Sequence, residues 1–593
     1  NALDANTTGT DNTAVGRGAS VCNTTGLCNT SMGGNALACN TTGCYNAAYG
    51  RDALCANTTA NSNTAVGVSA LKANTTGTSN TAVGFKSALT NTTGACNVSV
   101  GERSLLVNTS GAGNTAVGFR AMEDTTTADF NTAVGRQSMF SNTTGSRNVA
   151  VGLNAMYSVT TGVCNVAIGP NALYSVTTGT TNTAVGSCAL EANTGVSNVA
   201  VGCGALDANT SADANVAVGT NSLGANTTAG SNTAVGHEAL AANTTGTNNV
   251  AVGHQALKAN TTAGVNVAVG KSAMLVNTTG AENVAFGNSL EANTTGSCNS
   301  ALGNGSLQAN TTGSFNTGAG RFALKKNTTA NNNTAVGMCS LFDNTTGGNT
   351  VGVGFQSLMN QTTGDSNIGI GERSGCGLTT GNGNIIIGQG AGQATITGHC
   401  NIAVAYQGFV GLTSGGCNVA LGYRSMYSTT TGNNNSGIGR HSGCGITTGV
   451  NNTLLGHEAG TSSSPFTLTT EDHRVVVGNN DVSNAYIRVA WTVTSDLRDK
   501  TNFGKVPHGL DFVNKLNPVS FQFKKSREDD TPTGDLRYGF KAQDILELEG
   551  DNNVIIDTEE PDHLKYKGEH LVPVLVNAIK ELTKKVKELE DKE

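Results

Sequence analysis

The sequence predicts a mainly β protein, in which a long β-solenoid of 17-residue repeats is followed by a small α+β domain that ends in a helix. Three observations support this prediction. A glycine closes a short strand-like segment every 17 residues, only 13% of the residues are charged and 5% aromatic, and 37 of the 75 charges lie in the last 99 residues. A strict internal period of this kind is the sequence signature of a repeat architecture.

The predicted solenoid occupies residues 1–456 and contains 27 closing positions. Glycine fills all of them except one, where Ala405 stands, and two steps of 16 residues lead to Gly202 and Gly303. Of the seven prolines, only Pro170 lies in this region. Prolines are expected to be rare where backbone N–H groups are used in hydrogen-bonded ladders between coils.

One unit, residues 237–253, shows how each coil is expected to form. Val250 and Val252 face one way, while Asn249 and Ala251 face the other way. An Ala-Leu pair supplies a further apolar contact, and Asn-Thr-Thr-Gly has the composition of a turn. One unit cannot bury its apolar side alone, but stacked units can. The strand asparagine recurs in 26 of the 27 units, which predicts an asparagine ladder.

The strands resemble the head repeats of trimeric bacterial adhesins, which also stack short units rich in Asn or Ser, Ala or Val, and Gly. The unit here is longer and contains the additional Asn-Thr-Thr-Gly turn. The resemblance implies stacked coils on a surface structure, without implying the same coil geometry.

Composition excludes several partners. The net charge of -7 offers no basic patch for nucleic acid, and no apolar run is long enough to span a membrane. The cysteines and histidines form no cluster with the spacing of metal ligands, and we expect no cofactor. Because residue 1 lies inside a repeat, we expect the chain to be a fragment that lacks an N-terminal anchor.

Three further patterns have a structural and a functional interpretation. We interpret the fifteen cysteines as small residues, although Cys22 and Cys39, and Cys400 and Cys417, are spaced to form disulfides between stacked coils. The Asn-Thr-Thr triplets match the glycosylation sequon, but we interpret them as turn residues. The glycine-rich segment 388–393 is not followed by a helix, so we do not interpret it as a phosphate-binding loop.

The 17-residue period stops after Gly456, and residues 457–494 are predicted to form a β-rich neck. Its two β-rich segments, residues 473–480 and 485–493, flank a turn. Trp491, the only tryptophan, is expected to cover the apolar end of the solenoid, the alternative being that it stacks on a sugar.

Residues 495–593 contain several motifs in order: Ser-Asp-Leu-Arg-Asp-Lys at 495–500, Leu-Asp-Phe-Val-Asn-Lys-Leu-Asn-Pro-Val-Ser-Phe-Gln-Phe at 510–523 and Tyr-Gly-Phe-Lys-Ala-Gln-Asp-Ile at 538–545. Together they resemble the intramolecular chaperone domain of phage tailspikes and tail fibres, the endosialidase-type self-cleaving peptidase family S74. The last motif departs conservatively from the usual Ala-Gln-Glu-Val form.

The resemblance implies that Ser495 is the nucleophile and Lys500 the general base that cut the Thr494–Ser495 bond. A lysine amine acts as a base only where desolvation favours its neutral form, and assembly of the chain could supply that burial. Asp496 and Arg498 are expected to form a structural ion pair. The alternative is that the segment is merely a polar turn.

The closing helix carries apolar residues at alternating spacings of three and four, which is typical of a coiled-coil seam. The seam residues are Val572, Leu575, Ile579, Leu582, Val586 and Leu589. β-branched residues alternating with leucine favour dimers in isolated coils, whereas the family resemblance implies a homotrimer.

From these observations we expect a homotrimeric viral fibre or spike on the virion surface that binds a host surface glycan or receptor. A virion protein would hold it through the missing N-terminal part. Its only enzymatic act would be self-cleavage. The alternatives are a cellular adhesin or surface filament, and a glycan-degrading virion spike. The repeats carry no distinctive pair of carboxylates to support the latter.

Overall fold

The computed structural model describes residues 1–488, 495–524, 527–551, 553–559 and 561–592. These residues form two compact units, Asn1–Thr380 and Gly381–Glu593. Among the helices in these ranges, none has the length and apolarity needed to cross a bilayer.

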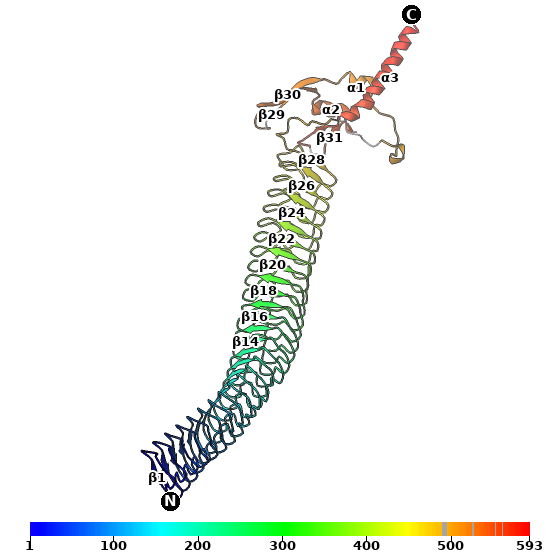
Figure 1. Cartoon of the computed structure of the whole chain (residues 1–593). Coiled ribbons are helices and arrows are strands. Elements are labelled where there is room, and N and C mark those ends of the chain that lie inside the picture. Colours follow the sequence, from blue (N-terminus) through cyan, green and yellow to red (C-terminus); the bar gives the residue numbers. More distant parts are fainter. Residues whose placement is uncertain (489–494, 525–526, 552, 560, 593) are drawn as a thin grey trace. The chain divides into compact units, whose positions relative to one another are not determined.

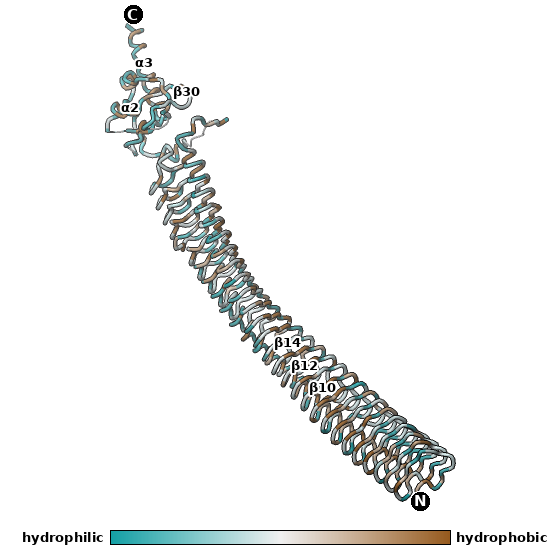
Figure 2. The backbone as a smooth tube through the Cα atoms, turned by 90° about the vertical axis from the view of Figure 1, so that its left-hand side faces the viewer, coloured by the Kyte–Doolittle hydropathy of each residue, from teal (hydrophilic) through white to brown (hydrophobic). Residues whose placement is uncertain are grey.

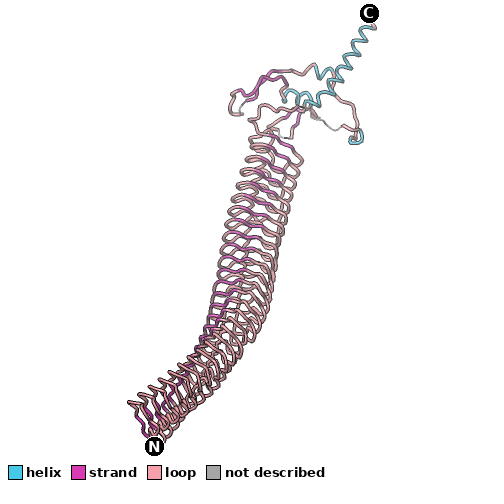
Figure 3. The backbone as a smooth tube through the Cα atoms, in the orientation of Figure 1, coloured by secondary structure: helices cyan, strands magenta, loops and turns pink. Residues whose placement is uncertain are grey.

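Unit 1, Asn1–Thr380, is a stack of coils in which each coil contributes one three-residue strand. Neighbouring strands are parallel and one coil apart, so that Thr13 pairs with Thr30 and Val15 with Met32 (Figure 1). The strands form a single magenta column in Figure 3, and turns complete each coil. The strands are β1 (Thr13–Val15), β2 (Thr30–Met32), β3 (Ala47–Tyr49), β4 (Thr64–Val66), β5 (Thr81–Val83), β6 (Val98–Val100), β7 (Thr115–Val117), β8 (Thr132–Val134), β9 (Val149–Val151), β10 (Val166–Ile168), β11 (Thr183–Val185), β12 (Val199–Val201), β13 (Val216–Val218), β14 (Thr233–Val235), β15 (Val250–Val252), β16 (Val267–Val269), β17 (Val284–Phe286), β18 (Ser300–Leu302), β19 (Thr317–Ala319), β20 (Thr334–Val336), β21 (Val351–Val353) and β22 (Ile368–Ile370).

The two short steps in the period do not disturb the alignment of the strands. Thr183 of β11 pairs with Val199 of β12, and Val284 of β17 pairs with Ser300 of β18, each across 16 residues. In the first case the turn reads Asn-Thr-Gly at 193–195 instead of Asn-Thr-Thr-Gly. The missing residue is therefore lost from a turn, and the ladder keeps its register.

The alternation of the strand residues is confirmed, but the side that is buried is not the valine side. Asn249 and Ala251 are fully buried, whereas Val250 and Val252 lie half-buried at the surface of the coil. Leu240, of the Ala-Leu pair, is also fully buried. The sequence pattern left open which side lies inside, and the structure buries the side that carries asparagine and alanine. Figure 2 shows the resulting alternation of hydrophobic and hydrophilic stretches around each coil.

The narrow interior explains why alanine, and not valine, points inward. At Gly352, which occupies the alanine position of its coil, an added Cβ would lie 2.6 Å from Oγ of Ser340 and 3.1 Å from Cγ of Leu341. The serine and the leucine therefore fill the space opposite the strand, and only a small side chain fits there. Larger residues at this position would overpack the interior. Where glycine replaces the leucine, at Gly375 and Gly443, the larger Ile386 and Leu454 are buried at the strand position instead.

The predicted strand asparagine ladder is confirmed. Asn249 donates its backbone N–H to Oδ1 of Asn232 at 2.9 Å, and its Nδ2 donates to the Ala263 carbonyl at 2.9 Å. Each amide thus binds the coils on both sides. Buried polar groups must be paired in this way, because an unpaired one costs about 1–3 kcal/mol.

A second ladder, which the sequence analysis did not predict, is formed by the asparagine of each Asn-Thr-Thr triplet. Asn243 is fully buried, and its Nδ2 donates to Oδ1 of Asn226 and to the Gly246 carbonyl, both at 3.0 Å. Thr244 Oγ1 donates to the Thr261 carbonyl of the next coil. These contacts support the interpretation of the triplets as turn residues, since the amide of Asn243 is not accessible in the folded coil.

The fifteen cysteines are free thiols. Cys22, Cys39, Cys400 and Cys417, which the spacing allowed to pair, are exposed and unlinked. Only Cys339 and Cys376 are buried, both in unit 1. Most cysteines are therefore surface residues of the coils, and few of them contribute to the interior.

Unit 2, Gly381–Glu593, begins with further coils of the same kind. Its parallel strands are β23 (Ile385–Ile387), β24 (Ile402–Val404), β25 (Val419–Leu421), β26 (Ser436–Ile438), β27 (Thr453–Leu455) and β28 (Val475–Val477).

The first part of the neck continues the coils past Gly456. Thr453 of β27 pairs in parallel with Val475 of β28, across 22 residues instead of 17. Leu468 is fully buried within this longer coil, and Thr447 Oγ1 donates to the Thr469 carbonyl, as in the repeats. The segment 473–480 therefore supplies a solenoid strand. Residues 485–488 form no strand, while 489–494, including Trp491, lie outside the described residues.

The C-terminal part of unit 2 is the predicted small α+β domain. Its antiparallel pairs are β29 (Val519–Lys524) with β30 (Pro532–Gly539), and β31 (Ile556–Asp557) with β32 (Lys565–Tyr566). Its helices are η1 (Leu497–Asp499), α1 (Leu510–Val513), α2 (Ala542–Glu549), η2 (Gly568–His570) and α3 (Leu571–Glu590). The core contains Phe512, Ile545, Ile555, Ile556, Leu571 and Val574.

Glu549 at the end of α2 organises the loop that follows. Its side chain is 6% exposed and accepts hydrogen bonds from the backbone N–H groups of Val554, Ile555 and Ile556 at 2.7–2.9 Å. The carboxylate therefore satisfies three buried donors where the chain enters β31.

The final helix α3 presents two different faces. Leu571, Val574 and Ala578 are buried against the domain. The predicted seam adjoins this buried face and is exposed, from 38% at Leu575 to 65% at Leu589. The heptad pattern is thus present on the helix, and its apolar seam is not covered within one chain.

Replacing Gly253 by alanine is expected to destabilise its coil by about 2 kcal/mol or more. Gly253 has φ +138°, and an added Cβ would lie 2.5 Å from the Gly270 carbonyl oxygen of the next coil. Gly224→Ala is the matched control, because an added Cβ there meets no atom closer than 3.5 Å. Hydrogen exchange of the two coils measures the difference, and equal effects of both substitutions would contradict this packing.

Candidate self-cleavage site

The site predicted from the sequence lies at the start of the C-terminal domain, in the turn around η1. Ser495 precedes this turn, and Lys500 is the residue that ends it. The Lys500 backbone N–H donates to the Leu497 carbonyl at 3.3 Å. The turn brings two residues that are five apart in sequence back to the same place.

The structure joins the two predicted catalytic side chains. Lys500 Nζ donates a hydrogen bond to Ser495 Oγ at 2.5 Å. A serine hydroxyl needs a base within hydrogen-bonding distance to become a nucleophile, and an amine at this distance meets the geometric condition. The arrangement is therefore that of a serine–lysine dyad.

Asp496 and Arg498 form the predicted ion pair, which holds the turn. The Asp496 carboxylate accepts from the Arg498 backbone N–H at 2.8 Å and from its guanidinium at 2.6 and 3.0 Å. The side-chain hydrogen bonds from Arg498, followed by its backbone N–H, lower the pKa of Asp496 below its ordinary value. The two residues contact each other and not the dyad, so their role is to shape the turn.

The dyad is exposed in the single chain. Both Ser495 and Lys500 are classed as exposed, as are the residues between them except the half-buried Asp496. Lysine serves as a base where it is desolvated, and a single chain does not provide that burial. Thr494, whose carbonyl would be attacked, lies outside the described residues.

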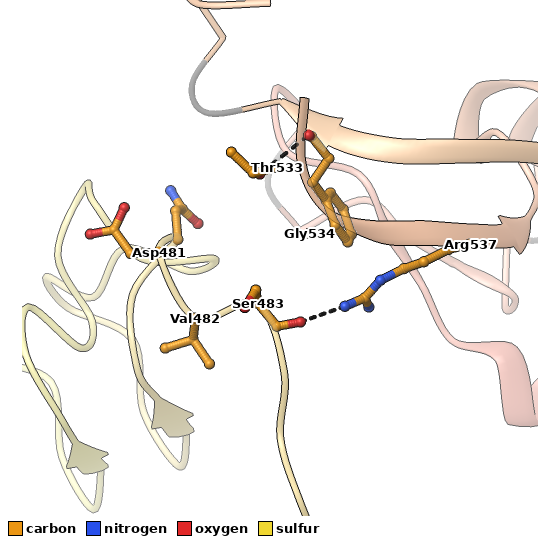
Figure 4. A pocket seen from close by; sticks show the side chains of 8 residues that line it. Asp481, Val482, Ser483, Thr533, Gly534 and Arg537 are labelled. Carbon is orange, nitrogen blue, oxygen red and sulfur yellow. Dashed lines mark hydrogen bonds between the residues drawn. The ribbon is translucent and has the colours of Figure 1, made fainter. Parts of the chain in front are cut away.

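A cleft of about 260 Å³ lies between the neck and the β29–β30 hairpin. Arg537 donates a hydrogen bond to the Ser483 carbonyl at 2.5 Å across it, as Figure 4 shows. Val482, Phe523 and Gly534 also line the cleft. The neck around Ser483 is thus in contact with the β29–β30 hairpin of the C-terminal domain.

Other contacts also join the last coil to the C-terminal domain. Arg474 pairs with Glu559, and Lys565 Nζ lies 3.5 Å from the centre of the Phe466 ring. Neither these residues nor Arg537 were singled out by the sequence analysis. They are far apart in sequence and belong to no motif, so only the folded chain brings them together.

Comparison with known proteins identifies one part of the chain. Residues 495–554 match the model of the family described as chaperone of endosialidase, Peptidase_S74. No curated protein and no solved structure matches the chain. The matched segment begins at the serine of the dyad and ends within the loop organised by Glu549.

The substitution Arg498→Gln is expected to raise the pKa of Asp496 towards its ordinary value, because it removes the largest cause of the lowering. Since the pKa is lowered in the folded chain, the pair stabilises the turn above about pH 4 and this stabilisation is lost as the pH falls through the lowered pKa. Carboxyl NMR with labelled aspartate measures the shift. Lys505→Gln is the control, and an equal response to both substitutions would contradict the pairing.

Proposed function

We propose that the chain is a homotrimeric fibre or spike protein whose C-terminal domain is an intramolecular chaperone that cuts itself off at the Thr494–Ser495 bond. The observation that carries the proposal is the hydrogen bond between Lys500 Nζ and Ser495 Oγ, at the first residue of the segment that matches the chaperone family. The long repetitive coil stack ahead of that segment supports a fibre.

In the proposed reaction the neutral amine of Lys500 takes the proton from Ser495 Oγ, which attacks the carbonyl carbon of Thr494. The bond between this carbon and the Ser495 nitrogen breaks, and Lys500 returns the proton to the leaving nitrogen. The product is an ester between Thr494 and Ser495 Oγ. Water then hydrolyses the ester, leaving a carboxyl group on Thr494 and the free hydroxyl of Ser495.

The exposure of the dyad suggests how cleavage is timed. A protonated lysine in water is a poor base, so an isolated chain would remain intact. Packing of three C-terminal domains, through the exposed seam of α3, would cover the site and favour the neutral amine. Cleavage would therefore follow assembly.

The proposal also assigns a role to the coils. On a virion surface they would form the part that reaches the host and binds a surface glycan or receptor, with a virion protein holding the N-terminal side. The exposed positions after the closing glycines support such a role, since they vary between aromatic, basic and acidic residues from coil to coil.

Wild-type chain is expected to run as two fragments on a denaturing gel, and Ser495→Ala and Lys500→Ala as one full-length chain. The first substitution removes the nucleophile and the second the base, and rates should fall at least a hundredfold. Lys505→Ala, which changes an exposed lysine outside the dyad, should still be cleaved. Cleavage of Ser495→Ala at the normal rate would rule out the proposed chemistry.

A chain of residues 1–494 produced alone is expected to aggregate or to assemble in mixed registers, because it lacks the domain that aligns the copies. Sedimentation velocity and electron microscopy distinguish these products from uniform trimers. The uncleaved Ser495→Ala chain is the control and should assemble normally. Uniform trimers formed by residues 1–494 alone would refute the chaperone role.

A further inference from the structure

The coils of unit 1 leave uncovered one uncharged surface, in which a column of apolar residues runs beside a column of valine, threonine and other small residues. It consists of the first and third residues of β1–β22, here called the outer strand face. None of these residues is buried, and among the third residues Val15 is 55% exposed and Phe286 and Leu302 are each 44% exposed. In a solenoid whose interior is filled by alanine, leucine and asparagine, these side chains make no contribution to the core.

The outer strand face carries no charge along the whole of unit 1. Its first residues are Thr, Val, Ala, Ser or Ile, and its third residues are Val, Met, Tyr, Ile, Phe, Leu or Ala in all 22 strands of that unit. The next exposed position along the coil, after the closing glycine, is often charged: Arg17, Arg51, Glu102, Arg136, Lys271 and Arg321. The outer strand face is thus uncharged, whereas the neighbouring column of residues after the closing glycines often carries charge, although both are accessible to water in the single chain.

The outer strand face has enough exposed apolar area to form a protein–protein interface. A half-exposed valine presents roughly 40 Å² of apolar surface, so the third residues of 22 strands present on the order of 900 Å². A standard protein interface buries about 800 Å² per partner, whereas the largest apolar patch on a typical monomer is about 300–600 Å². The outer strand face therefore exceeds what a soluble monomer usually exposes.

The length, lack of charge and repeat spacing of the outer strand face indicate which partner would bind it. A partner must be as long as the stack, uncharged along its length, and repeat at the spacing of the coils, because the apolar residues recur once per coil. The same face of another copy of this chain, running parallel, meets all three conditions. The α3 seam is a second apolar surface that one chain leaves exposed, and association of copies would cover both.

We propose that the outer strand face is the surface through which copies of this chain pack against one another, parallel and with their coils aligned. This inference rests on the proposed homotrimer and adds the face by which its coils meet. It also gives a reason for a chaperone. Because every coil presents nearly the same face, a shift by one coil preserves most contacts, so the alignment must be set elsewhere.

The first test places three lysines on the outer strand face, in Val235→Lys/Val252→Lys/Val269→Lys. The matched control is Thr228→Lys/Thr245→Lys/Thr262→Lys, at exposed turn positions in the same part of the stack. Native mass spectrometry measures association, and circular dichroism checks that coils form. The valine variant should associate at least tenfold more weakly than the control. Equal association of the two folded variants would overturn the inference.

A second test does not depend on weakening the assembly. A benzophenone photocrosslinker replaces Val252 or, as the control, Thr245 in the full chain, and a denaturing gel reports covalent pairs of chains. Crosslinks from position 252 to strand residues of another copy support the inference, while crosslinks from position 245 alone overturn it. If wild-type chain is monomeric throughout, the proposed homotrimer itself fails.

Discussion

The buried asparagine amide is the interaction on which the coil stack depends. A coil of 17 residues has too few apolar side chains to be held by burial alone, and its turns direct carbonyl groups into the interior. Asn249 and Asn243 satisfy those groups and at the same time bind the coils above and below. Each such bond contributes about 0.5–1.5 kcal/mol, and its loss leaves buried groups unpaired. The stack therefore combines a narrow apolar core with a continuous ladder of strand residues and a second ladder of turn asparagines, which is interrupted where residues such as Val159 and Val176 take the asparagine position.

One coil shows how the missing amide of a strand asparagine is replaced. Thr350 stands where the other repeats have the strand asparagine, and in the next turn Gln361 replaces the usual asparagine. The longer Gln361 side chain donates to the Gly364 carbonyl at 2.7 Å and to Oγ1 of Thr350 at 3.3 Å. The extra methylene of Gln361 lets its amide reach the hydroxyl of Thr350, the residue that stands where the other coils have the strand asparagine. The two departures from the repeat compensate each other.

The same regularity creates a difficulty for folding. Identical coils specify their neighbours well within one chain, because a slip would move the asparagines off their partners. Between the chains of the proposed homotrimer, a shift by one coil changes little. A domain that differs from the repeats, is rich in charge and carries a helical seam can supply the missing alignment. Its position after the last coil, with contacts such as Arg537 to the Ser483 carbonyl, suits that task.

The residues of the local motif could be predicted from the sequence, whereas the long-range contacts around the site could not. Ser495, Lys500 and the Asp496–Arg498 pair lie within six residues, so a local motif contained them, and the turn brings them together as expected. The contacts of Arg537 and of Arg474 with Glu559 connect segments more than fifty residues apart. No local pattern records such contacts, because they depend on how the hairpin and the last coil fold.

The sequence by itself determined the coil: its 17-residue period, its strand, its turn and the ladder of strand asparagines, since each is a local pattern repeated at a constant spacing. It also determined the heptad of α3. Only the tertiary structure decided which side of the strand lies inside. The alternation of residues along a strand shows which residues share a side, but the pattern does not show which of the two sides is buried. The choice depends on the width of the closed coil, where Leu240 leaves room for the methyl group of Ala251 and turn carbonyls need the amide of Asn249, so the larger valines lie outside.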